Sequence, residues 1–235
     1  MESQQHPERA AQPRARRVSH WWPLVSGLVA LGLSVGLGAL IIVREQGMPL
    51  AIDTRWLNDV TASRSPGWDA AALVMDTLGG GLVATFLLPA VITIAFLLAR
   101  RPWAAGFYLG VSLVTGALVQ LLKHFFSRAR PENILTNLDF GSFPSGHVAN
   151  ATITAAVLAI LVPRVWVWVA GAVYTVAMML SRTYLGAHWL TDTVGALLLG
   201  VAVTAILWAP VAARLDGERH LSAERRSMKA GTIPH

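Results

Sequence analysis

The sequence of 235 residues contains no cysteine, which excludes disulfide bonds and metal sites built from thiolates. Charged residues are also scarce, because Asp, Glu, Lys and Arg make up 14% of the chain, whereas about a quarter is usual in a soluble domain. Hydrophobic residues make up 54%, and the mean hydropathy is +0.52. Much of the surface must therefore face something other than water, and we expect lipid.

Acidic residues are fewer than basic ones, with 13 Asp and Glu against 19 Lys and Arg and a formal net charge of +6. Such a balance can indicate a nucleic-acid partner. Here, however, the basic residues punctuate apolar runs and do not line one face, as a nucleic-acid site would require. We therefore expect membrane lipids and no nucleic acid as partners.

Six apolar runs organise the chain. They cover residues 21–43, 80–99, 103–122, about 147–162, about 165–181 and about 189–209. Their lengths approach or match the ~20 residues that a helix needs to cross a ~30 Å hydrocarbon core. The first run is followed by charged residues and lacks the cleavage site of a signal peptide, so we expect it to be retained. The sequence predicts an all-α polytopic membrane protein with six transmembrane helices in one bundle.

The segments around these runs are polar. Residues 1–18 have no periodicity and are expected to form a disordered N-terminal arm. Residues 44–69, between the first two runs, are expected to form an interfacial helix and a loop. The membrane domain then covers 19–211, and the charged segment 212–235 is predicted to be a disordered cytoplasmic tail.

Two pairs of glycines have the spacing that allows helices to approach closely: Gly32 with Gly36, and Gly106 with Gly110. Packing inside one bundle is the preferred interpretation, and an interface between two copies is the alternative. The oligomeric state stays open.

The distribution of basic residues predicts the orientation. If the N-terminus is cytoplasmic, twelve of the nineteen lysines and arginines fall on that side and seven on the other. The positive-inside rule then places both termini in the cytoplasm. We expect a multi-pass protein of the plasma or inner membrane, with the polar loop 123–146 on the extracytoplasmic side.

Three polar clusters interrupt this apolar chain. They are KHFFSRARP at 123–131, SFPSGH at 142–147 and SRTYLGAHWLTD at 181–192. With the topology above, all three fall at the same outward ends of the third to sixth runs. We therefore expect them to form one shared pocket.

The last cluster contains His188 and Asp192, which are four residues apart and share one face of a helix. A carboxylate that binds one imidazole nitrogen fixes the tautomer and leaves the other nitrogen free to act as a nucleophile or a base. A capping pair at the start of the last helix explains the spacing equally well.

The middle cluster predicts a helix N-terminus, because Pro144, Ser145 and Gly146 form a turn before an apolar run. Free backbone amides and the helix dipole bind an anion there without a metal. His147, in the first turn, could protonate a leaving group as a general acid. An ordinary serine cap followed by a surface histidine is the alternative, and it is the better explanation of this cluster alone.

Other charged residues could face the same anion. Guanidinium groups match phosphate oxygens and lysine adds a point charge, so Lys123, Arg130 and Arg182 are candidates for a phosphate clamp. The alternative is that they reach lipid headgroups, which we prefer for Arg128. Asp76 is expected to cap the second span, although it could also help to close the pocket.

Taken together, these residues resemble the type 2 phosphatidic acid phosphatase (PAP2) superfamily. Its three-part signature is matched in order by Lys123, Arg130 and Pro131, then by Pro144, Ser145, Gly146 and His147, then by Ser181, Arg182, His188 and Asp192. The likeness covers roughly residues 20–210, and every position of the signature is filled.

The resemblance implies a metal-independent phosphatase that works without a cofactor through a phosphohistidine. It implies that His188 attacks phosphorus, that Asp192 orients its ring and that His147 protonates the leaving oxygen. The phosphoryl oxygens are then bound by Lys123, Arg130, Arg182 and the amides near Ser145 and Gly146.

A pocket at the membrane surface suits a lipid phosphate. The resemblance favours an isoprenoid pyrophosphate such as undecaprenyl pyrophosphate, or phosphatidic acid or phosphatidylglycerophosphate. Two alternatives stay open: a lipid phosphotransferase that uses the same intermediate, and a non-catalytic carrier of lipid phosphates. Mere binding would not require two histidines and Asp192, which counts against the carrier.

Overall fold

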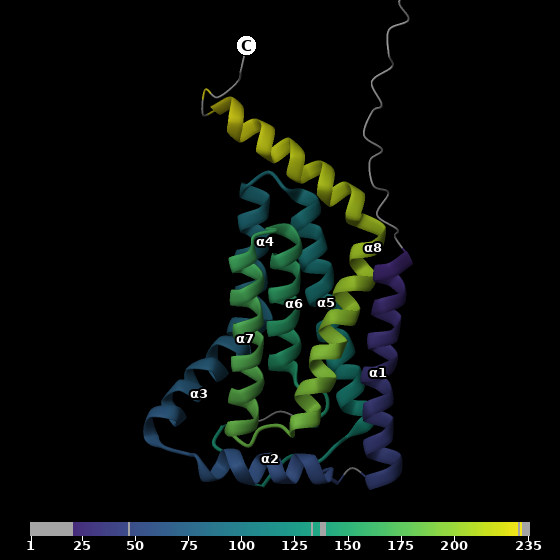
Figure 1. Cartoon of the computed structure of the whole chain (residues 1–235), viewed down its shortest axis with the longest axis vertical. Helices are drawn as coiled ribbons and strands as arrows, with labels where there is room; N and C mark the ends of the chain where they lie inside the picture. Colours follow the sequence, from purple (N-terminus) through teal and green to yellow (C-terminus); the bar gives the residue numbers. More distant parts are fainter. Residues whose placement is uncertain (1–20, 47, 133, 137–139, 230, 232–235) are drawn as a thin grey trace, which may run out of the picture.

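Every regular element in the described part of the chain is a helix (Figure 1). The computed structural model describes residues 21–46, 48–132, 134–136, 140–229 and 231. The helices are α1 (Trp21–Glu45), α2 (Ala51–Ala62), α3 (Pro66–Gly79), the π-helical turn η1 (Val83–Leu87), α4 (Leu88–Leu98), α5 (Pro102–Phe126), α6 (Gly146–Leu161), α7 (Val165–Tyr184) and α8 (Leu190–Lys229). The all-α class is confirmed, whereas the arm predicted for residues 1–18 lies outside the described residues.

The helices form one bundle with α2 lying across one end (Figure 1). Helix α6 packs against α5, α7 and α8, and α1 packs mainly against α8. Residues such as Val148, Val157 and Leu199 are fully buried between these helices. The core thus surrounds α6, whose first residues lie at the α2 end of the bundle.

The prediction of six membrane spans is confirmed in part. By length and composition, α1, α5, α7 and α8 can each cross a membrane, and α3 with η1–α4 forms a fifth candidate that is bent by 41°. The remaining run corresponds to α6, which has only 16 residues and rises about 24 Å at 1.5 Å per residue, less than the ~30 Å core. The first residue of α1 and the end of α8 lie at the end of the bundle opposite α2 (Figure 1). The side of the membrane that each end faces stays a prediction.

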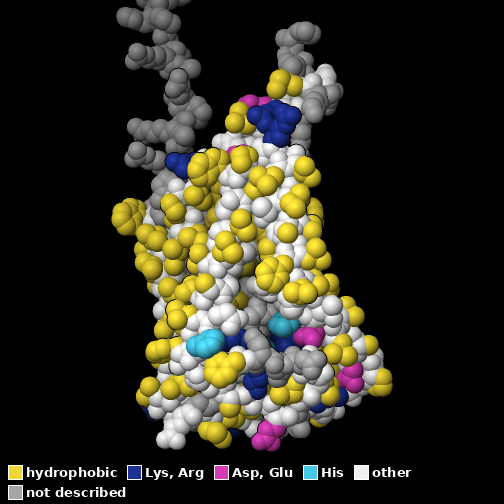
Figure 2. Space-filling view, turned by 180° about the vertical axis from the view of Figure 1, so that it is seen from behind, with side chains coloured by type: hydrophobic (Ala, Val, Ile, Leu, Met, Phe, Trp, Pro, Cys, Tyr) yellow, Lys and Arg dark blue, Asp and Glu magenta, His cyan; other side chains and the backbone are white. Residues whose placement is uncertain are grey.

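The surface fits a lipid environment. Figure 2 shows hydrophobic side chains along the bundle, while acidic, histidine and several basic side chains gather toward the end where α2 lies. Large apolar residues such as Val43, Leu98 and Val165 are about four-fifths exposed (80%, 81% and 81%). Because water would not favour such exposure, the chain is a multi-pass membrane protein.

The second apolar run begins as a bent structure instead of a straight span. Helix α3 starts at Pro66, well before residue 80, and ends at a turn of three glycines. Gly81 adopts φ +57°, a conformation that favours glycine. A Cβ on Gly80 would overlap the His147 ring. Glycine at this turn therefore lets the end of α3 contact α6 directly.

The charged tail does not begin where the sequence predicted. Residues 212–229 were expected to be disordered, but α8 continues through them to Lys229. The side chain of Glu218 is buried and accepts hydrogen bonds from the amides of Trp103 (2.8 Å) and Ala104 (3.0 Å). First-turn amides lack partners within their own helix, so this carboxylate satisfies the start of α5 and fixes the extension.

The preferred interpretation of the glycine pairs, packing inside one bundle, is wrong. A Cβ on Gly32, Gly36, Gly106 or Gly110 would meet nothing within 4 Å. Helices instead approach at Gly27, where a Cβ would lie 2.7 Å from Ile206, and at Gly200, where it would lie 2.8 Å from Thr152. The two glycine pairs therefore lie on open faces of α1 and α5. The glycines that do contact another helix, Gly27 and Gly200, have no second glycine four residues away.

Candidate active site

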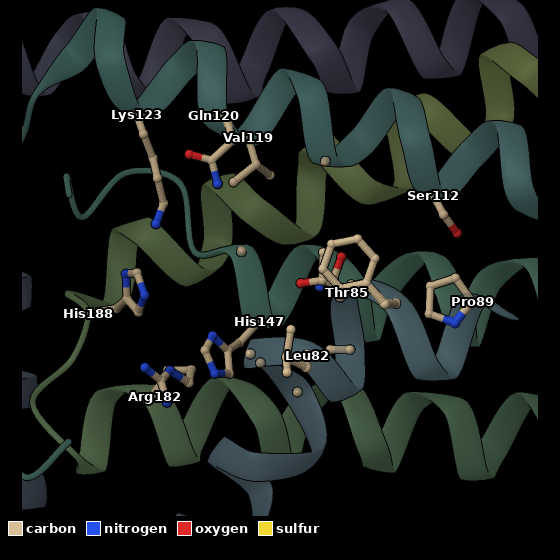
Figure 3. A pocket seen from close by; sticks show the side chains of 18 residues that line it. Leu82, Thr85, Pro89, Ser112, Val119, Gln120, Lys123, His147, Arg182 and His188 are labelled. Atoms are coloured by element: carbon tan, nitrogen blue, oxygen red, sulfur yellow. The ribbon is translucent and has the colours of Figure 1, made fainter. Parts of the chain in front are cut away.

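The three polar clusters of the sequence meet at one cavity of about 640 Å³. Its walls come from the glycine turn after α3, from η1 and α4, from α5, α6 and α7, and from the segment before α8. Five of the eight predicted site residues line it: Lys123, Gly146, His147, Arg182 and His188. Figure 3 shows the side chains of Lys123, His147, Arg182 and His188 converging at one end of the cavity.

His188 lies between α7 and α8 and is only 2% exposed. Its Nδ1 lies 2.8 Å from the carbonyl oxygen of Ser142. A carbonyl can only accept, so Nδ1 carries the proton and Nε2 has the lone pair. Nε2 lies 3.3 Å from Nη1 of Arg130. Ser142, and not the predicted Asp192, is thus the hydrogen-bond partner that fixes the tautomer.

The protonation of His188 is opposed by its surroundings. Burial lowers the pKa of its imidazole well below the usual value, and the positive charges of Arg182, Arg130 and Lys123 lower it further. The ring is therefore neutral near pH 7, as a nucleophilic nitrogen requires.

Asp192 is fully buried and binds mainly Arg128, not His188. Its Oδ2 lies 3.6 Å from Nδ1 of His188, beyond a hydrogen bond, and accepts from the amide of Trp189 at 2.9 Å. Its Oδ1 lies 2.5 Å from Nη1 of Arg128. Asp192 remains close enough to act on the His188 ring electrostatically, while Arg128 neutralises it.

Arg128 was predicted to reach lipid headgroups, and this is wrong. Its side chain is fully buried, with Nη2 at 2.7 Å from Oδ2 of Asp53 and Nη1 donating to the Thr191 hydroxyl at 2.8 Å. A buried guanidinium requires such compensation, and two carboxylates provide it. The position lies within the first motif, but between the residues that its spacing specifies.

Asp53 connects α2 to this centre and was not predicted from the sequence. Its carboxylate accepts from the Thr191 amide (2.9 Å) and hydroxyl (2.8 Å) as well as from Arg128. A single acidic residue in an interfacial helix gives no signal of such a role. The partner, Thr191, is 138 residues away in the chain.

The remaining phosphate-clamp residues, Arg130 and Lys123, both lie near His188. Arg130 donates to the carbonyls of Ala187 and Gly141, both at 2.7 Å, and so it fixes two loops while touching the His188 ring. The Lys123 side chain points into the cavity near His188 (Figure 3). Both residues place positive charge beside Nε2 of His188.

The start of α6 provides backbone donors, as predicted, but not at every position. The Ser145 amide already donates to the carbonyl of Asp192 at 3.2 Å, so it is not the phosphate-binding group that the motif suggested. Gly146 is the first residue of α6 and lines the cavity. Amides in a first helical turn lack intrahelical acceptors, and those of Gly146 and His147 can bind an anion.

Asp76 was expected to cap the second span, and instead it contacts two residues that line the cavity. Its Oδ1 is 3.0 Å from Nε2 of His147 and also accepts from Nη1 of Arg182. Its Oδ2 accepts from the Thr136 hydroxyl at 2.7 Å. The less favoured interpretation of Asp76, closure of the pocket, is the one that the structure supports.

The arrangement suits phosphoryl transfer. A buried neutral imidazole faces a cavity that Lys123 and Arg182 line, with Arg130 beside the ring, helix-start amides and a second histidine on the other side. Phosphoryl transfer chiefly requires an aligned nucleophile and positive charge around the phosphoryl oxygens.

The chain is similar to known membrane phosphatases. The sequence profile described as "PAP2 superfamily" matches residues 103–216. The chain is 31% identical over 148 residues to decaprenylphosphoryl-5-phosphoribose phosphatase of Mycobacterium tuberculosis, covering 60% of this chain and 80% of the relative. It is 30% identical over 118 residues to undecaprenyl-diphosphatase of Sulfolobus acidocaldarius, covering 46% of this chain and 56% of that relative.

The fold is also similar to a solved structure, that of a transmembrane PAP2 type phosphatidylglycerolphosphate phosphatase from Bacillus subtilis. The TM-score is 0.66 at 25% identity, over 77% of this chain and 94% of that one. The sequence match to the Sulfolobus enzyme spans only a little over half of that relative's length. All three polar clusters lie within the range of the family profile, residues 103–216.

Proposed function

Because this chain belongs to the PAP2 superfamily, we propose that it is a metal-independent lipid phosphatase that works through a phosphohistidine. The observation that carries the proposal is the His188 ring. Its Nδ1–H is held by a carbonyl, its pKa is lowered, and its Nε2 lies beside Arg130 at the cavity. This is a nitrogen with a fixed lone pair beside a site for an anion.

In the first step, Nε2 of His188 forms a bond to phosphorus while the bond between phosphorus and the leaving oxygen breaks. Lys123, Arg182 and the Gly146 amide surround the phosphoryl oxygens, and Arg130 exchanges its contact with the ring for one with the phosphate. His147 transfers a proton to the leaving oxygen, so that the lipid departs as an alcohol or a phosphate.

In the second step, water attacks the phosphohistidine. The new P–O bond replaces the N–P bond, His147 takes the proton of the water, and His188 becomes neutral again. The positive charge that Asp192 stabilises at 3.6 Å exists only while the His188 ring is phosphorylated. Inorganic phosphate is then released into the aqueous end of the cavity.

The cavity supports a lipid as the substrate. Beyond the polar end it continues between α5 and the η1–α4 segment, past Leu82, Phe86, Pro89 and Val119. An apolar chain could occupy this part while its phosphate reaches His188. We propose an isoprenoid pyrophosphate or a glycerophospholipid phosphate, acted on at the extracytoplasmic membrane face.

The test is phosphate release by detergent-purified protein in excess EDTA. Phosphatidic acid, phosphatidylglycerophosphate and undecaprenyl pyrophosphate are offered separately to the wild type and to His188→Ala. We expect release that survives chelation and falls by a factor on the order of a thousand or more in the variant. His124→Ala is the matched control, because His124 is an exposed histidine on α5 outside the cavity lining, and it should keep full activity.

Two other outcomes would redirect the proposal. A phosphorylated product that forms only when an acceptor alcohol is added would identify a phosphotransferase. Binding of the lipids without any turnover by a folded protein would indicate a carrier. A phosphoenzyme that is labile to acid and stable to base, and that is absent in His188→Ala, would support the phosphohistidine.

A further inference from the structure

Asp76 lies outside all three motifs, yet it contacts residues from two of them. Its Oδ1 binds His147 of the second motif at 3.0 Å and Arg182 of the third. Its side chain is 21% exposed and is therefore not part of the closed core, and both of these partners line the cavity. The mechanism above does not use this carboxylate.

The surrounding contacts hold this carboxylate and the ring together. The Thr136 hydroxyl donates to Oδ2 of Asp76 at 2.7 Å and fixes its orientation. On the other side, Gly80 contacts the His147 ring so closely that a Cβ would overlap it. The ring and the carboxylate are thus positioned by three elements: α3 with its glycine turn, α6, and the loop that contains Thr136.

The charges that face His147 explain why a carboxylate is needed there. Arg182 approaches from α7 and Lys123 from α5, whereas the neutral His188 lies on the segment before α8; all three line the same cavity. Nearby positive charge disfavours a protonated imidazole. Asp76 on α3 is the acidic group in contact with this ring among the described residues.

We propose that Asp76 is a positioning residue that holds His147 as the proton donor of the reaction, an inference that rests on the proposed phosphatase function. Asp76 keeps one proton on Nε2 and favours the imidazolium, and the proton on the other ring nitrogen passes to the leaving oxygen. As the bond between phosphorus and that oxygen breaks, His147 becomes neutral. In the second step His147 regains this proton from the attacking water, and the balance is restored.

The role predicts a dependence on the leaving group. An alkoxide must be protonated as it departs, whereas a nitrophenolate is stable enough to leave without a proton. Asp76→Asn should therefore lower kcat/KM for phosphatidic acid by about ten- to a hundredfold more than for a nitrophenyl phosphate that carries an alkyl chain on its ring, given that general acids contribute about 10²–10⁴-fold.

Two further variants complete the experiment. Asp69→Asn is the matched control, because Asp69 lies two turns earlier on α3 and binds the Tyr184 hydroxyl at 2.6 Å, away from His147; the ratio of the two activities should not change. Thr136→Val removes only the hydroxyl that orients Asp76, and should shift the ratio in the same direction by less. Thermal unfolding of each variant in detergent measures folding separately.

The outcomes separate this inference from the proposed function. If the wild type releases no phosphate from either substrate, the proposed phosphatase function fails. If the wild type is active and folded Asp76→Asn loses activity equally on both substrates, Asp76 has only a structural role and the inference is overturned. A gain of activity would overturn it as well, because Asp76 would then be an obstacle to the phosphate. If Asp76→Asn does not fold, Thr136→Val decides by the same ratio.

Discussion

The neutral state of His188 has a consequence for the pH dependence of the reaction. Burial and the charges of Arg182, Arg130 and Lys123 lower its pKa well below 6.5. We expect protonation of His188 to lower kcat/KM only well below pH 6.5. Between pH 7 and pH 6, His188 should therefore cause no loss of activity. A profile of kcat/KM against pH for a soluble substrate measures it. A limb at or above pH 6.5 that shifts in Arg130→Gln would contradict the assignment.

The lowered pKa of His188 also makes the free energy of unfolding depend on pH. Between the lowered pKa and about 6.5, the unfolded chain binds a proton at His188 that the folded chain does not bind. The contribution of this group to the free energy of unfolding therefore falls as the pH is lowered through that window. Above about pH 6.5 both states are neutral at this position, and its contribution no longer changes.

The motif residues could be predicted from the sequence because their chemistry depends on residue type and spacing. Lys123, His147, Arg182 and His188 line one cavity as expected. Asp53 and Arg128 could not be predicted, because a buried ion pair between distant segments leaves no local pattern. The contact of the Ser142 carbonyl with His188 could not be predicted either, because every residue has a backbone carbonyl and the sequence gives no signal for one of them.

Asp53 is the side chain of helix α2 that binds the buried residues beside the candidate active site. Asp53 is buried and binds Arg128 and Thr191, whereas Asp59 on the same helix is exposed. Removing one partner of a buried charge pair typically lowers stability by about 3–5 kcal/mol. We expect Asp53→Ala to show such a loss in unfolding experiments in detergent, and Asp59→Ala to show almost none. Equal stability of the two variants would show that the buried network does not hold α2.

Helix boundaries were predictable where lipid determines them. Apolar runs gave the positions of α1, α5, α7 and the start of α8, because a membrane requires a minimum apolar length. They failed for α3, which begins at Pro66 among polar residues. They failed also beyond residue 212, where the contact of Glu218 with the start of α5 maintains the helix. In the extension of α8, packing against another part of the protein, and not lipid, stabilises the helix.

The orientation in the membrane can be tested because the chain has no cysteine of its own. Ser63→Cys places one thiol after α2 near the active-site end, and Ser227→Cys places one on the extension of α8 at the opposite end; both positions are exposed. We expect a membrane-impermeant maleimide to label Ser63→Cys on intact cells, and Ser227→Cys only after the cells are permeabilised. The reverse pattern would show that the active site faces the cytoplasm.

The contact between Asp53 and Thr191 also has a consequence for biosynthesis. The two residues are 138 positions apart, so at about 5–20 residues per second Thr191 leaves the ribosome roughly 7–28 s after Asp53. During this time α3 to α7 are synthesised, while the Asp53 carboxylate still lacks its partner Thr191. The proposed nucleophile, His188, is itself made only three residues before Thr191. A nascent chain that ends with α7, at Tyr184, thus contains Lys123, Arg130 and Arg182 but lacks His188, and the proposed catalytic centre is completed as one of the last events of synthesis.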